Sequence, residues 1–129
     1  MQDFKKYFII PASPEEVYLA LTREETVALW TGAETEMNAV VDGEFSMWDG
    51  AIVGRFLELE PGKKIVQEWY FGEQEEASVA TIKLHEDKKG TSLELRHTNI
   101  PDEAYEDISE GWEDPYIASL IEFYLDERG

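Results

Sequence analysis

The spacing of apolar residues changes once along this chain, and the change limits the folds that it can adopt. From about Thr35 to Ile100 apolar residues recur at every second position, as they do in strands. After Pro101 they recur at helical spacing. Turn pairs such as Asp42-Gly43 and Pro61-Gly62 separate the strand-like runs, and loops this short favour antiparallel neighbours. The sequence therefore predicts an antiparallel meander followed by one long helix.

An α+β fold follows from this order of elements. A first strand, Phe4–Ile10, comes before two short helices and the meander. The apolar face of the sheet has no other partner within the chain, so the last helix must cover it. We expect a curved antiparallel sheet wrapped around the C-terminal helix, with a space between them. The predicted meander strands are Glu36–Val41, Gly43–Trp48, Ala51–Glu60, Lys64–Phe71, Ser78–Glu86 and Thr91–Ile100.

Helix start signals follow the first strand. Ser13, Pro14 and Glu16 form a capping box with proline at the first helical position. Thr22 followed by Glu25 repeats the signature and predicts a second helix. Gly32 is expected to end that helix.

The last helix has an uncertain beginning. Its apolar stripe predicts a helix that ends near Glu127, after an acidic connector, Asp102–Asp107, that is expected to be a solvated loop. Pro115 cannot donate a helical hydrogen bond, so either Asp114 caps the helix or a first turn through Trp112 is bent. The stripe consists of Trp112, Tyr116, Leu120 and Phe123.

Composition narrows the class of protein. Length predicts one domain, residues 1–129, and the absence of cysteine excludes disulfides and thiolate chemistry. The chain carries 11 Lys and Arg against 29 Asp and Glu, a formal charge of -18, which makes nucleic acid and anionic membranes unfavourable partners. The charge favours solubility, or docking to a basic partner. Without a signal peptide or a long apolar stretch, the sequence predicts a cytoplasmic protein.

The two histidines do not predict a metal site. His85 and His97 have opposite parity on neighbouring predicted strands, so their rings should point to opposite faces. His97 shares the parity of Leu93 and Leu95, which predicts an inward ring whose pKa is lowered by burial. No P-loop, dinucleotide fingerprint or nucleophile elbow occurs. We therefore expect no catalytic residue, metal or cofactor.

Aromatic residues are numerous, and as a group they suit an apolar pocket with a few polar handles. Core packing is the ordinary alternative for each of them. The expected ligand is a small hydrophobic or amphipathic molecule, with His97 as a polar handle. The expected ligand-binding residues are Phe45, Met47, Trp69, Phe71, His97, Trp112, Tyr116, Leu120 and Phe123.

Three stretches carry a family resemblance. They are Pro11 to Val17 with its continuation to Trp30; Gly54, Glu58 and Pro61 followed by Trp69; and Gly111-Trp112 with Tyr116 and Leu120. In this order they resemble the START-like helix-grip superfamily (SRPBCC), in the branch named after activators of the heat-shock chaperone ATPase. Asp114-Pro115 departs from the regular last helix of that family.

The resemblance implies a helix-grip fold and leaves three functions open. The first is a module that binds a hydrophobic ligand between sheet and helix. The second is a co-chaperone-like protein that stimulates a heat-shock chaperone ATPase. The third is a cyclase- or hydrolase-type pocket enzyme with His97 as proton carrier. Both a monomer and a homodimer are compatible with the sequence.

Overall fold

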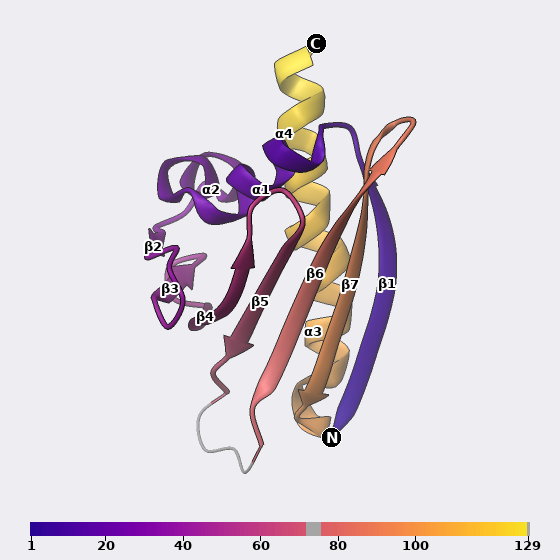
Figure 1. The fold of residues 1–129 in the computed structure, drawn as a ribbon. Coiled ribbons are helices and arrows are strands. Elements are labelled where there is room, and N and C mark those ends of the chain that lie inside the picture. The colour runs from indigo at the N-terminus through magenta and orange to yellow at the C-terminus, as the bar shows by residue number, and fades with distance from the viewer. Residues whose placement is uncertain (72–75, 129) are drawn as a thin grey trace.

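One antiparallel sheet dominates the fold, with its strands in the order β1-β7-β6-β5-β4-β3-β2 (Figure 1). The computed structural model describes residues 1–71 and 76–128, and the side chains as far as Leu125. The predicted meander is confirmed, because each strand from β2 to β7 pairs with the next. The strands are β1 (Gln2–Ile10), β2 (Glu36–Met37), β3 (Glu44–Met47), β4 (Ile52–Glu60), β5 (Lys64–Trp69), β6 (Ser78–Asp87) and β7 (Gly90–Ile100).

Strand β2 is much shorter than the predicted Glu36–Val41, whereas the other predicted strand ends are correct to within two residues. The chain turns directly after Met37, where the N–H of Val40 donates to the carbonyl of Asn38 at 2.8 Å. The N–H of Gly43 then donates to the carbonyl of Val40 at 2.8 Å. A Cβ at Gly43 would overlap the carbonyl oxygen of Asn38, so only glycine fits this close approach.

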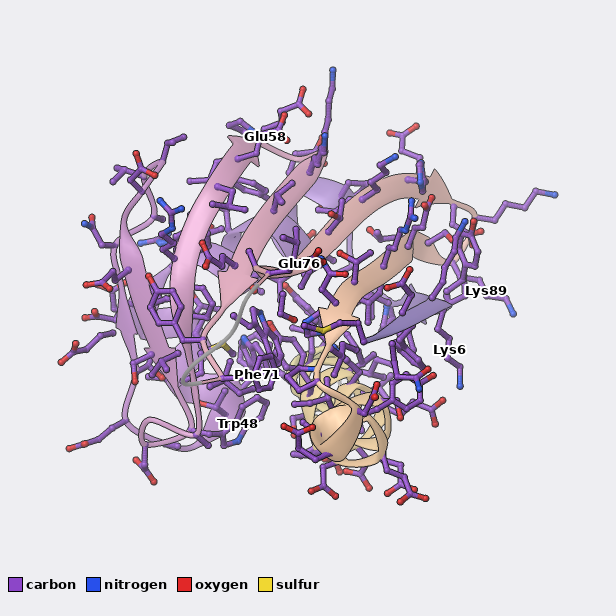
Figure 2. The ribbon with its side chains drawn as sticks, turned by 90° about the horizontal axis from the view of Figure 1, so that it is seen from below. Lys6, Trp48, Glu58, Phe71, Glu76 and Lys89 are labelled. Carbon is purple, nitrogen blue, oxygen red and sulfur yellow. The ribbon has the colours of Figure 1, made fainter. Side chains whose placement is uncertain are left out.

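The sheet curves around the C-terminal helical segment, which Figure 2 shows nearly end-on. Inward-facing residues of β5, β6 and β7 form the core together with one side of that segment, and each large apolar side chain buried there contributes about 1.5–3 kcal/mol. The α+β helix-grip arrangement is thus confirmed. The central core comprises Ile65, Ile82, Leu84, Leu93, Leu95, Trp112, Tyr116, Ile117 and Leu120.

Helix α1 (Pro14–Thr22) begins as predicted. The Ser13 hydroxyl accepts a hydrogen bond from the backbone N–H of Glu16 at 3.2 Å, and Pro14 is the first helical residue. This side-chain bond satisfies one of the amides that a helix start leaves free.

The predicted cap of helix α2 (Glu24–Thr31) is wrong. Thr22 is the last residue of α1, and its hydroxyl donates to the carbonyl of Tyr18 at 2.8 Å instead of capping α2. Arg23 occupies the cap position without a side-chain hydrogen bond. Gly32 ends α2 in the left-handed region, at φ 66°, as expected.

The acidic connector is helical, which corrects the expectation of a loop. A 3-10 turn, η1 (Asp102–Ala104), leads directly into helix α3 (Tyr105–Gly111). Glu106 and Asp107 lie in the first turn of α3, where carboxylates favour the positive end of the helix dipole. Acidic composition therefore stabilises this segment as a helix.

The helical run bends at Asp114. The irregular turn η2 (Trp112–Ile117) contains this one extended residue, at φ -146° and ψ 115°, before Pro115. Helical geometry lies on both sides of Asp114, so a bent helix that starts before Trp112 describes the segment, and Asp114 is not its beginning. Helix α4 (Ala118–Arg128) completes the fold, close to the predicted end.

Candidate functional site

His97 lies on the inner face of β7, between Ala80 of β6 and Phe4 of β1 in the sheet register. Its side chain is 0% exposed. The predicted inward orientation is confirmed, because the indole N–H of Trp112 donates to Nδ1 of His97 at 3.0 Å. His85 is exposed and contacts Glu94 on the outer face, so the two histidines point to opposite faces as predicted.

The hydrogen bonds around His97 fix its tautomer. An indole nitrogen can only donate, so Nδ1 accepts and Nε2 carries the ring proton. Nε2 lies 2.8 Å from the Ser78 hydroxyl, which donates in turn to the carbonyl of Thr98 at 3.2 Å. Burial lowers the pKa of His97 to about 4 from its ordinary 6.5. The ring is therefore neutral near pH 7, with both nitrogens bonded within the protein.

Aromatic rings surround this hydrogen-bonded chain. Trp69 stacks on Trp112 with centroids 4.9 Å apart, and its edge meets the His97 ring at 4.8 Å. Phe71 lies 6.4 Å from His97, and Trp112 is 4.4 Å from Tyr116. The structure thus brings these five predicted site residues into one cluster, which we call the His97 cluster.

Met47 joins the His97 cluster at its edge through Tyr116. The Tyr116 hydroxyl donates to Sδ of Met47 at 3.9 Å, and burial raises the pKa of this phenol. Leu120 is buried in the same core.

Two predicted site residues lie outside the His97 cluster. Phe45 packs against Phe56 at 5.2 Å, and it also lines a pocket of about 240 Å³ near Tyr70. Phe123 is half-buried beside Tyr124, at 5.2 Å. Neither ring has a described ring contact with His97.

Two polar residues that are hydrogen-bonded to the His97 cluster were not predicted. Ser78 holds Nε2 of His97, and Gln67 accepts a hydrogen bond from the Trp69 indole at 2.9 Å. Gln67 is completely buried, and its amide nitrogen has no hydrogen-bond partner among the described residues. The parity of Gln67 with Ile65 and Trp69 is the sequence signal that places it inward.

Figure 2 shows Phe71 and Trp48 between the sheet and the helical segment, at the end of the molecule from which it is viewed. Both side chains are half-buried, whereas the rings of Trp69, Trp112 and Tyr116 are buried. Trp48 contacts Trp30 at 5.6 Å and Tyr116 at 5.4 Å. Phe71 and Trp48 are therefore more exposed than the rings of Trp69 and Tyr116 that they adjoin.

Two other kinds of site were sought in the described residues. Within 1–71 and 76–128, no group of three or more His, Asp or Glu side chains is placed to hold a metal ion. Among the helices of the same residues, none is both long and apolar enough to cross a membrane.

A family model described as "Activator of Hsp90 ATPase homolog 1-like protein" matches residues 11–123. The chain belongs to this family. It is 37% identical over 110 residues to the human activator of 90 kDa heat shock protein ATPase homolog 1, and 31% identical over 103 residues to the homolog from Dictyostelium discoideum. These matches cover 84% and 78% of the chain. The chain spans only 32% and 27% of the two relatives.

Solved structures agree with this Hsp90-activator family. An HSP90 activator from Plasmodium falciparum superimposes with a TM-score of 0.86 at 27% identity, covering 98% of this chain and 97% of that one. The Aha1 dimer from Colwellia psychrerythraea gives a TM-score of 0.82 at 20% identity, covering 94% of each chain, and it supports the fold.

Proposed function

We propose that this chain is a co-chaperone-type domain that binds an Hsp90-class chaperone in the cytoplasm. The packing around His97 among the described residues is the observation that carries the proposal. Both nitrogens of His97 are hydrogen-bonded within the protein. The Trp112 indole packs against the rings of His97, Trp69 and Tyr116. Around His97, side chains of the protein itself occupy the bonding positions that a ligand would use, which supports function at the outer surface. The 37% identity to the human ATPase activator supports a chaperone as the partner.

Binding to purified human Hsp90 tests this proposal. We expect saturable binding in isothermal titration calorimetry at low salt, weakening as salt rises, since charged surfaces contribute to docking. An unrelated acidic protein serves as the control for nonspecific charge effects. Binding is the main readout and stimulation of ATP hydrolysis the secondary one, because the chain spans only about a third of the human activator. If calorimetry shows no heat of binding at low salt, and the two proteins do not co-elute in size-exclusion chromatography, the proposal is ruled out.

A small hydrophobic or amphipathic ligand is the second candidate, and Gln67 is the observation that favours it. Its buried amide nitrogen is an unused donor beside Trp69, and an unpaired buried donor is unfavourable by about 1–3 kcal/mol. A ligand oxygen reaching Gln67 would remove that penalty. Such a ligand would lie against the ring of Phe71, which is half-buried, whereas the other members of the His97 cluster are buried.

Native mass spectrometry of freshly purified protein tests the second candidate, together with titration of decanoic acid monitored by tryptophan fluorescence. A retained small molecule, and weaker decanoate binding in the Gln67→Leu variant, are the expected results. Ser46→Ala, at a half-buried position on β3, is the control variant. Protein that carries no ligand and shows no fluorescence change would exclude this candidate without affecting the first.

A further inference from the structure

The strands carry five of the eleven basic residues of the chain on the outer face of the sheet, which points away from the helical segment. Arg55 of β4 is paired with Asp42 and Glu68, and the other four lie on β1, β5, β6 and β7. Lys64 of β5 lies directly opposite Lys83 of β6, and Lys5 of β1 lies directly opposite Arg96 of β7. Side chains opposite each other in a sheet project from the same face. We call these four residues the outer basic patch.

Like charges in directly opposed positions destabilise a sheet. Two opposed pairs are basic with basic, although on its other side Lys83 lies opposite Glu94 of β7. Lys83 and Arg96 are exposed and make no ion pair with any residue in the described part of the chain. Local unfavourable arrangements of this kind concentrate at functional surfaces.

The other two cations of the outer basic patch have only weak partners. Lys64 contacts Glu58 at 3.1 Å, and Lys5 lies 4.0 Å from Glu94. Exposed ion pairs contribute about 0–1 kcal/mol, so an incoming carboxylate can replace them readily. Glu58 is labelled in Figure 2 on the outer side of the curved sheet.

The register makes the outer basic patch continuous. Thr81 lies opposite both Arg96 and Val66, and Lys83 is two residues further along the same strand. Lys83 and Arg96 are therefore diagonal neighbours, roughly 7–8 Å apart. Val66 and Thr81 provide a small uncharged floor between the charges.

The side of the molecule that carries the helical segment is acidic. Figure 2 shows carboxylate tips projecting around the helical segment. The acidic residues there are Asp102, Glu103, Glu106, Asp107, Glu110, Glu113, Asp114 and Glu122.

We propose that the outer basic patch binds an acidic segment of a partner protein. Four cations on a short stretch of sheet match a few Asp or Glu side chains of one peptide. A nucleic acid is a poorer fit, because its many phosphates would also face the -18 charge of the whole chain. The segment need not belong to an Hsp90-class chaperone, so this proposal and the proposed function can fail separately.

Fluorescence anisotropy with a labelled peptide of alternating glutamate and serine tests the proposal. The variant Lys83→Glu/Arg96→Glu should bind at least about tenfold more weakly, because two charge contacts become repulsive. The matched control, Lys88→Glu/Lys89→Glu, makes the same change of net charge at the turn between β6 and β7. It should retain nearly full affinity. The neutral variant Lys83→Gln/Arg96→Gln should show a smaller loss.

Thermal melting separates binding from folding. Replacing Lys83 and Arg96 by glutamine removes the opposition of like charges without placing a second carboxylate opposite Glu94, so the melting temperature should stay the same or rise while peptide binding falls. Equal loss of binding in the patch and control variants would overturn the proposal. So would tighter binding of a single-stranded oligonucleotide than of the peptide. Self-association that disappears in the patch variant would assign the face to a second copy and would equally overturn it.

Discussion

The indole N–H of Trp112 points at Nδ1 of His97, 3.0 Å away, and this bond ties the C-terminal helical segment to strand β7. The indole is also stacked on Trp69. Position and tautomer of the imidazole therefore depend on where the helical segment lies. A shift of that segment along the sheet would break a hydrogen bond and a ring contact together.

Trp112→Phe should destabilise the protein by about 1–3 kcal/mol beyond the loss of ring area, because Nδ1 of His97 would keep no donor in a dry interior. Urea denaturation measures the change. Trp48→Phe is the matched control, since the Trp48 indole N–H has no hydrogen-bond partner among the described residues. Equal losses for the two variants would show that the bond to His97 contributes nothing.

Stability should depend on pH through His97. Its pKa is about 4 in the folded protein and near 6.5 when unfolded, so the unfolded chain binds the proton more readily. The contribution is fully present above about pH 6.5 and is lost as the pH falls towards 4, by roughly 3 kcal/mol in all. His97→Gln should flatten this part of the unfolding profile. Parallel profiles for protein and His97→Gln variant would contradict the prediction.

Two glycines should respond oppositely to alanine. Gly43→Ala should destabilise the protein by more than about 2 kcal/mol, because the new Cβ overlaps the carbonyl oxygen of Asn38. Gly111→Ala should stabilise it by about 0.5–1 kcal/mol, because this helical position has no atom within 4 Å of a Cβ. Differential scanning calorimetry of both variants gives the comparison. A stable Gly43→Ala protein would mean that the turn after β2 adjusts freely.

Ser13→Ala should destabilise α1 by about 1 kcal/mol, since the amide of Glu16 loses its acceptor. Thr22→Val should have a smaller effect, because the Thr22 hydroxyl donates to Tyr18 within α1 and caps no helix. Chemical denaturation of the two variants measures this ranking. The reverse ranking would support the capping box that the sequence predicts at Thr22.

Periodicity was sufficient to predict the sheet and the inward side of His97. Residues two apart share a face, so Leu93 and Leu95 located the histidine. The same rule would have located Gln67, but the apolar pattern draws attention away from a polar residue inside it. The hydrogen-bond partners of His97 could not be predicted, because the bond from Trp112 depends on how a helical segment distant in the sequence lies across the sheet.

Local signals failed where two elements compete for one residue. Thr22 can cap a following helix or close the preceding one, and its bond to Tyr18 decides for the second. Val40 and Val41 read as strand, yet the tight approach of Gly43 to Asn38 imposes a turn. Expectations about Asp102–Asp107 failed because acidic residues suit both solvated loops and helix starts.

The pairing of β1 with β7 delays folding during synthesis of the polypeptide. Gln2 lies opposite Ile100 and Ile10 opposite Thr91, so β1 meets its partner only after the residues as far as β7 have been synthesised. Until then its inward-facing aromatic side chains have no sheet to cover. The domain therefore exposes the apolar side of β1 until β7 and the helical segment have been synthesised, and it closes only then.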